Sequence, residues 1–284
     1  MDMSARKYHL VGIGEDQMVA LALALKASGH EVSGSDASVS PKAEQALKAQ
    51  GLSASSNWNI NGMAKEDVVV FKQSAGSDNP AIAKAKELGC QILTVAQLIK
   101  SVTVDQQRIV ISGKLKSLIT SIVLFVLESF KRRFDHFANT SNDMDEAVKL
   151  NGNPLIIVEA TSELGDLTDY HHHIAVISGG EDEKTLEPFA NASPKGGSLI
   201  FNAHDPVTNR IGSKERVDVN QIPFKVPPHE VRDGKVILTE PKEAVVVQLK
   251  GEDQLLALSG ARELLKRIGI TSDQFFSTIG DYLP

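Results

Sequence analysis

The sequence contains a single cysteine, Cys90, among its 284 residues. One cysteine cannot form an internal disulfide, so the chain fits a reducing compartment such as the cytosol. The sequence also has no excess of positive charge, because 30 Lys and Arg residues stand against 36 Asp and Glu residues. A chain with this balance lacks the broad basic surface that neutralises phosphates, so we do not expect nucleic acid as its main partner.

Long apolar runs are missing as well. The N-terminal segment 1–7 is polar and has no apolar stretch of the signal-peptide type. The most apolar later run, 118–127, is about half of the roughly 20 residues that a membrane-spanning helix needs. We therefore expect a cytoplasmic protein that does not associate with membranes. Its length predicts about two domains if each takes roughly 150 residues.

The first third of the sequence alternates strand and helix signals. Apolar or β-branched runs predict strands, and helix formers between capping residues and glycines predict helices. This alternation predicts a parallel, doubly wound sheet in a domain spanning 1–104. The expected strands are 8–12, 31–34, 67–71 and 91–93, and the expected helices are 18–27, 41–50 and 80–88.

A second unit is expected over 105–284. Buried strands and a long helix come first, and the pattern changes after Lys214 to an antiparallel pair around the turn 240–242. Thr271 and Gln274 form a capping box for a last short helix. The fold class is thus α/β, with an N-terminal Rossmann-like parallel sheet and a second α/β domain bearing a small antiparallel extension. The expected strands are 108–112, 155–158, 174–177, 198–201, 235–238 and 244–247, and the longer helices are 117–132 and 253–268.

A glycine turn joins the first strand to the first helix. Gly12-Ile13-Gly14 lies where a nucleotide phosphate would meet a helix N-terminus. The third glycine of the dinucleotide fingerprint would fall at Gln17, and Asp16 would repel a phosphate. A tight turn without a ligand is therefore the competing interpretation.

A second loop between a strand and a helix, 113–117, has part of a phosphate-binding motif. Gly113, Lys116 and Ser117 match the pattern G-x-x-x-x-G-K-[ST], whose lysine contacts phosphates and whose hydroxyl binds Mg²⁺. The loop is short, and the glycine that normally precedes the lysine is missing. The competing interpretation, equally open, is an ordinary basic loop between a strand and a helix that binds no phosphate.

Three other features have both a functional and a structural interpretation. Glu159 ends a buried strand, where it is either a Mg²⁺ ligand or a solvated carboxylate. The three histidines 171–173 alternate in direction along an extended chain, so they predict a polar lead-in to a strand rather than a metal site. Cys90 follows a glycine that ends a helix, and we predict that it fills space in the core as a small apolar side chain.

Several segments, taken in order along the chain, match one known family. They are 10–14, 29–36, 74–75 and 78–80 in the first unit, and 113–117, 158–160, 174–177 and 202–206 in the second. They resemble the Mur ligases, the ATP-dependent amide ligases that build the peptidoglycan stem peptide. Within that family, the resemblance is greatest to the ligases that add L-alanine or recycle the tripeptide.

The resemblance implies a Rossmann-like domain that holds a UDP-muramyl nucleotide and a central P-loop ATPase-like domain that uses ATP and Mg²⁺. Carried over by position, Gly113, Lys116 and Ser117 would contact phosphates, and Ser117 and Glu159 would bind Mg²⁺. The UDP-sugar site would be lined by Gly12, Gly14, Ser35, Asp36 and Ser74.

The departures from the family pattern indicate a compromised ligase. The phosphate loop lacks a glycine, and the carboxylate-rich strand end of the family is reduced around Glu159. Gly179 and Lys184 stand where the family has an asparagine and a metal-binding histidine, and a lysine ammonium has no lone pair for a metal. The resemblance also leads us to expect that the C-terminal ligase domain of the family is missing. It identifies no catalytic residue in this sequence.

The leading hypothesis is a degenerate Mur-ligase-like protein that acts by binding or assembly, with a protein partner or a second copy of itself. The alternative is a functional or split ligase that a partner domain completes. A nicotinamide-dependent oxidoreductase is a third interpretation, since Asp36 could bind a ribose hydroxyl. The second unit, however, offers no hydride-transfer site.

Overall fold

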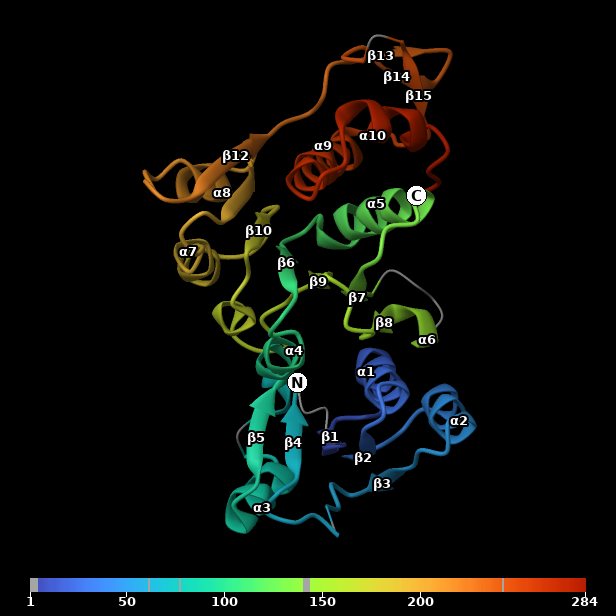
Figure 1. Ribbon diagram of the computed structural model, residues 1–284, viewed down its shortest axis with the longest axis vertical. Helices are drawn as coiled ribbons and strands as arrows, with labels where there is room; N and C mark the ends of the chain where they lie inside the picture. Colours follow the sequence, from blue (N-terminus) through green and yellow to red (C-terminus); the bar gives the residue numbers. More distant parts are fainter. Residues whose placement is uncertain (1–4, 61, 77, 140–143, 242) are drawn as a thin grey trace. The chain divides into compact units, whose positions relative to one another are not determined.

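The computed structural model describes residues 5–60, 62–76, 78–139, 144–241 and 243–284 (Figure 1). The chain divides into two compact units. Unit 1 comprises residues 1–106, 135–153 and 161–170, and unit 2 comprises 107–134, 154–160 and 171–284. Residues 1–4, within the predicted polar N-terminus, and Lys242, in the predicted turn 240–242, lie outside the described residues.

Unit 1 contains a five-stranded parallel sheet with the order β3-β2-β1-β4-β5. The predicted parallel sheet is confirmed, and its central strand, β1, is buried from Tyr8 onward. The strands are β1 (Lys7–Val11), β2 (Glu31–Asp36), β3 (Ala54–Ser56), β4 (Val68–Phe71) and β5 (Gln91–Thr94).

The helices Pro41–Ala49 and Pro80–Leu88 begin after the capping residues predicted from the sequence. Ser40 and Asn79 each accept a backbone N–H of the first turn, and a proline follows each of them. Gly89 ends its helix in the left-handed conformation. The helices are α1 (Asp16–Ala27), α2 (Pro41–Ala49), α3 (Pro80–Leu88), α4 (Val95–Val102) and α6 (Met144–Ala147), with 3₁₀ turns at Gln73–Ala75 and Leu167–Tyr170. The short strands β7 (Asp135–Phe137) and β8 (Val148–Lys149) pair antiparallel.

Unit 2 is built on five adjacent parallel strands with the order β12-β11-β10-β6-β9. A separate antiparallel sheet, β13-β14-β15, follows it along the chain, so the predicted small antiparallel extension is confirmed. The parallel strands are β6 (Gln107–Ser112), β9 (Leu155–Glu159), β10 (Ile174–Ile177), β11 (Ser198–Asn202) and β12 (Asn220–Phe224). The antiparallel strands are β13 (His229–Arg232), β14 (Lys235–Leu238) and β15 (Val245–Val247).

The helices of unit 2 include the two long ones that the sequence predicts. Helix α5 is apolar on almost every side, and it packs against α9. Thr271 and Gln274 form the predicted capping box of α10. The helices are α5 (Lys116–Ser129), α7 (Glu183–Asn191), α8 (Pro206–Gly212), α9 (Glu252–Arg267) and α10 (Ser272–Ile279). No described helix is long and apolar enough to cross a membrane.

Candidate functional site

Unit 1 has a cavity of about 370 Å³ at the carboxyl edge of its sheet. This is the edge at which parallel α/β sheets bind ligands, because the loops after neighbouring strands meet there. Four of the predicted UDP-sugar residues line it: Gly12, Gly14, Asp36 and Ser74. The other lining residues are Val11, Glu15, Ser38, Ser40, Trp58, Lys72 and Ala75.

Asp36 holds the glycine turn in place. Its Oδ2 accepts the backbone N–H of Gly14 at 2.8 Å, and its Oδ1 accepts the N–H of Ser38 at 3.2 Å. A Cβ on Gly14 would lie 2.7 Å from the Ser38 carbonyl oxygen, so this position requires glycine. The N–H of Gly12 donates to the Ser35 carbonyl at 2.8 Å. Both glycine amides are thus engaged within the protein and do not point freely at a phosphate.

The predicted residue Ser35 lies in the interior instead of the cavity. It is fully buried, and its hydroxyl is 2.9 Å from Nε2 of His9. Burial, with the nearby Lys7 charge, lowers the pKa of His9 to about 4. A neutral imidazole between the Ser33 and Ser35 hydroxyls is a structural element of the sheet.

Two lysines neutralise the acidic N-terminus of α1. Lys72 forms an ion pair with Glu15, and Lys42 lies 3.3 Å from Asp16. Only Lys72 lines the cavity, and its side chain is 10% exposed. Lys72 is not among the residues predicted from the sequence, although it directly follows the buried strand β4 at the carboxyl edge of the sheet.

Trp58 is the second residue that the sequence analysis missed. It lines the cavity and also packs against the core cluster around Val11 and Val69. Asn57 and Trp58 both have positive φ, at 56° and 57°. Consecutive non-glycine residues in this conformation are strained, and such strain is concentrated at ligand sites. No periodic pattern marks this segment, so its aromatic ring is located only by the fold.

In unit 2, hydrogen bonds to other groups of the protein occupy three backbone amides of the predicted phosphate loop. The N–H of Lys114 donates to the Gly179 carbonyl at 2.6 Å, and the N–H of Leu115 donates to the Ser178 hydroxyl at 3.1 Å. The N–H of Lys116 donates to the Gly113 carbonyl at 3.2 Å. A phosphate-binding loop works by directing such amides at phosphate oxygens. Here all three have protein acceptors.

The loop 113–117 also packs tightly against the loop 178–180. A Cβ on Gly113 would lie 2.5 Å from the Gly179 carbonyl oxygen, and one on Gly180 would lie 2.7 Å from Cβ of Lys114. The backbones therefore leave no space for a phosphate between them. The residues present do not fit the triphosphate of ATP in the manner of a P-loop.

The predicted metal residues are brought together. The Ser117 hydroxyl donates to Oε1 of Glu159 at 2.6 Å, and Glu159 is 4% exposed. Lys116 is half-buried in the first turn of α5. The neighbouring Lys114 forms an ion pair with Asp253 at 3.0 Å. Two oxygens in mutual contact form only part of a Mg²⁺ site, because the ion takes near-octahedral coordination.

A further carboxylate lies beside the loop. Oε1 of Glu181 accepts the hydroxyl hydrogen of Ser112 at 2.8 Å, while its buried Oε2 has no hydrogen-bond partner among the described residues. This negative charge next to the end of β6 disfavours an incoming phosphate. The Gly179 carbonyl accepts the N–H of Lys114 in the loop 113–117, and Lys184 is exposed on α7.

The side chains of the histidines 171–173 do not meet at a common point where a metal ion could bind. His172 is buried with Nε2 2.9 Å from the Ser193 hydroxyl, whereas Nδ1 of His173 accepts the backbone N–H of Arg108 at 3.0 Å. Burial lowers the pKa of His172 to about 3. Within the described ranges, no group of three or more His, Cys, Asp and Glu side chains is placed to hold a metal.

Cys90 is buried, and its thiol contacts the Ala64 carbonyl at 3.2 Å. Burial raises the pKa of this thiol, which keeps it protonated and unreactive. This agrees with the prediction of an apolar filler.

Comparison with known proteins connects this geometry to a family. Residues 7–106 match the model of the Mur ligase family, catalytic domain. The UDP-N-acetylmuramate–L-alanine ligase of Clostridium novyi is 26% identical over 270 residues, which cover 89% of this chain and 58% of that protein. The chain spans about half the length of the curated relatives it matches.

Solved structures show the same fold. The UDP-N-acetylmuramate:L-alanyl-γ-D-glutamyl-meso-diaminopimelate ligase from Neisseria meningitides superposes with a TM-score of 0.79 at 16% identity, covering 99% of each chain. The UDP-N-acetylmuramate-alanine ligase from Thermotoga maritima superposes with a TM-score of 0.73 at 15% identity, covering 97% of this chain and 68% of that one. The resemblance predicted from the sequence is thereby confirmed: residues 7–106 carry a Mur ligase family domain, and the chain as a whole has the fold of Mur ligases.

Proposed function

We propose that this chain is a catalytically degenerate Mur-ligase-like protein of peptidoglycan precursor synthesis or recycling, acting in the cytoplasm by binding or assembly. One observation carries this proposal. The amides of Lys114, Leu115 and Lys116 all donate to acceptors within unit 2, so these three amides are not free to donate to a triphosphate. The Glu181 carboxylate adds like charge at the same place.

The carboxyl-edge cavity of unit 1 supports the binding part of the proposal. Trp58 offers an aromatic surface on which a uracil ring can stack. Lys72 is the cation in the described lining of this cavity and could contact a diphosphate, and Ser38, Ser40 and Ser74 supply hydroxyl groups. A UDP-muramyl nucleotide is therefore the ligand class that we assign to this cavity.

The ligase reaction itself provides the first test. Release of the γ-phosphate of ATP is measured with UDP-N-acetylmuramate and L-alanine present. We expect release at the background rate, unchanged in Lys116→Met. Release well above background that Lys116→Met abolishes would identify a working phosphate site and contradict the proposal.

Calorimetry with UDP-N-acetylmuramate tests the binding part. Lys72→Met is expected to weaken binding about tenfold, the effect of losing one charge-assisted contact. Lys42→Met is the matched control, because Lys42 also pairs with the N-terminus of α1 but does not line the cavity. Equal effects of the two substitutions would place the nucleotide elsewhere.

The alternative is a functional or split ligase that a partner domain completes. The contact between Ser117 and Glu159 favours it, because both side chains implied as Mg²⁺ ligands are retained and lie together. Calorimetry with Mg²⁺ and a non-hydrolysable ATP analogue separates the two functions. Binding that is lost in Ser117→Ala would favour the ligase, and absence of binding at millimolar nucleotide would favour the degenerate protein.

A further inference from the structure

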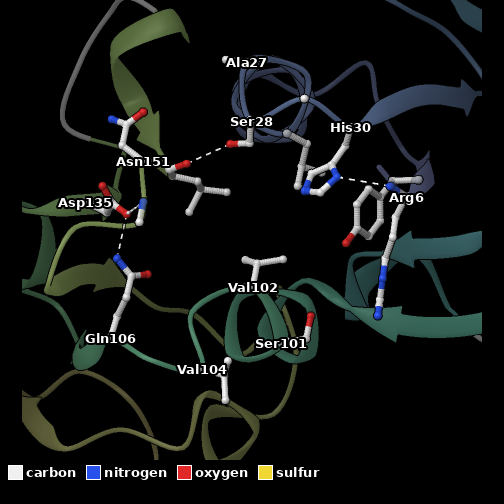
Figure 2. A pocket seen from close by; sticks show the side chains of 15 residues that line it. Arg6, Ala27, Ser28, His30, Ser101, Val102, Val104, Gln106, Asp135 and Asn151 are labelled. Atoms are coloured by element: carbon white, nitrogen blue, oxygen red, sulfur yellow. Dashed lines mark hydrogen bonds between the residues drawn. The ribbon is translucent and has the colours of Figure 1, made fainter. Parts of the chain in front are cut away.

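Unit 1 contains a second and larger cavity, of about 670 Å³, at the opposite edge of its sheet. Tyr8 at the start of β1 and His30 just before β2 place it at the amino edge, away from the predicted nucleotide site. Figure 2 shows Arg6 and His30 on one side, Gln106, Asp135 and Asn151 on the other, and Val102 between them. Cavities of this size accommodate drug-sized molecules.

Hydrogen bonds hold the far wall of this cavity in place. Asp135 is fully buried and accepts the Gln106 side-chain amide at 2.7 Å and the backbone N–H of Gly152 at 2.9 Å. The Ser28 hydroxyl, 2.8 Å from the Leu150 carbonyl, links the end of α1 to the same wall. Since these groups satisfy one another, the cavity is formed before any ligand enters, which lowers the entropic cost of binding.

The near side of the cavity provides hydrogen-bond donors and one positive charge. Arg6 is exposed, its side chain contacts the Tyr8 hydroxyl, and no ion pair joins its guanidinium to a carboxylate of the described residues. Nδ1 of His30 accepts the backbone N–H of Arg6 at 3.4 Å, so the neutral ring carries its proton on Nε2. Burial and the Arg6 charge lower the pKa of His30, which keeps the ring neutral at pH 7. This side therefore suits an anion with a single negative charge.

Between the two ends the lining is apolar. The aliphatic residues of the lining include Leu25, Val102, Val104 and Leu150, and Val104 is 52% exposed. Asp135, the only carboxylate among the described lining residues, accepts hydrogen bonds from donors of its own wall and is not available to a ligand cation.

We propose that the amino-edge cavity of unit 1 binds a small amphipathic carboxylate, with its anionic group on Arg6 and His30 and its apolar body against Leu25, Val102 and Leu150. This site is independent of the nucleotide cavity and of the phosphate loop. It assigns a ligand class to the larger of these two cavities in unit 1.

The test uses three probes with one apolar body and different end groups: 4-phenylbutyrate, 4-phenylbutyramide and 4-phenylbutylamine. Each is titrated into the 284-residue protein while the methyl resonances of Leu25, Val102 and Leu150 are followed by NMR. We expect the carboxylate to shift these resonances and to bind about tenfold more tightly than the amide, the value of one charged contact. The amine is expected to bind most weakly.

Variants locate the anionic end of the site. Arg6→Gln is expected to weaken binding of the carboxylate about tenfold and to leave binding of the amide unchanged. Arg6→Lys should retain most of the preference for the carboxylate over the amide. Arg232→Gln, an exposed arginine of unit 2, is the matched control and should change nothing. Val102→Phe should fill the cavity and weaken all three probes. Equal binding of the three probes, shifts confined to other methyl groups, or no binding at millimolar concentration would each overturn the proposal.

Discussion

At the scale of single residues, Gly14 shows how a site in this protein constrains its own sequence. Its φ is not in the left-handed region, so the requirement for glycine is purely steric. Oδ2 of Asp36 would lie 2.9 Å from an added Cβ, and the Ser38 carbonyl oxygen would be closer still. The glycine turn 12–14 noted in the sequence is present, but Gly14 is required by its contacts with Asp36 and Ser38 and not by an exposed amide.

We predict that Gly14→Ala destabilises the protein by about 1–3 kcal/mol, the usual cost of overpacking. Urea unfolding measures this change. Gly196→Ala is the control, because nothing lies within 4 Å of its added Cβ and only its positive φ of 77° opposes alanine. A Gly14→Ala protein as stable as the wild type would show that the turn relaxes freely.

Buried histidines should make the stability of the protein depend on pH. The pKa of His172 is lowered to about 3 from 6.5, and that of His9 to about 4. Below pH 6.5 the unfolded chain therefore binds more protons than the folded one, and stability falls as the pH falls from 6.5 toward those values. Each fully titrating group contributes about 1.4 kcal/mol per pH unit in that window.

We predict that His172→Gln reduces the slope of the unfolding free energy against pH by the amount that about one titrating proton contributes. Its side chain keeps a polar partner for Ser193 but does not titrate. Urea unfolding between neutral pH and pH 4 measures the slope, with His229→Gln as the control because His229 is exposed. An unchanged slope in His172→Gln would mean that His172 is protonated in the folded protein.

At the scale of elements, local signals predicted most helices and strands, and several shorter elements were not predicted, among them α4, α7, α8, β12 and β13. Helix α4 has a capping box, Thr94 with Gln97, that the sequence displays in plain form. It was overlooked because β5 runs into the helix without a loop. Strand β12 contains Pro223, which argues against a strand, but β12 lies at the edge of its sheet, where proline is tolerated. Strand β13 is exposed at every residue, so it has no apolar alternation to recognise.

The capping box of α4 gives a prediction at this scale. Thr94→Ala removes the side-chain oxygen that accepts the N–H of Gln97 at 3.2 Å. We expect a loss of about 1 kcal/mol in the free energy of unfolding, the usual value of an N-cap. Thr94→Ser should recover most of it, since serine retains the acceptor. No recovery would mean that the Thr94 methyl, and not its oxygen, stabilises the helix.

At the scale of the whole molecule, unit 1 is not continuous in sequence. Segments 135–153 and 161–170 belong to it, although they follow the first segment of unit 2 along the chain. The Leu164 carbonyl accepts the N–H of Ala96 at 3.2 Å, and a Cβ on Gly165 would lie 2.8 Å from Cβ of Ala96. Helix α4 is thus completed by residues far away in sequence.

We predict that a fragment of residues 1–104 retains its sheet but loses protection of α4. Amide hydrogen exchange of α4 should be faster in the fragment than in the full chain, because the contacts from 161–170 are missing. Exchange of α2 serves as the reference within the same fragment. Equal protection of α4 in both proteins would show that the later segments are dispensable for unit 1.

The sequence by itself determined the alternation of strands and helices, the caps of α2, α3 and α10, and the family resemblance, because these depend on residues close together along the chain. Only the tertiary structure decided which candidate residues share a site. It brought Ser117 to Glu159, turned Ser35 inward to His9, and closed the loop 113–117 on 178–180. It also formed the amino-edge cavity from 6–30, 101–106 and 135–152. Each of these outcomes depends on a hydrogen-bond partner or a packing surface supplied by a distant segment, and no local pattern encodes which segment that is.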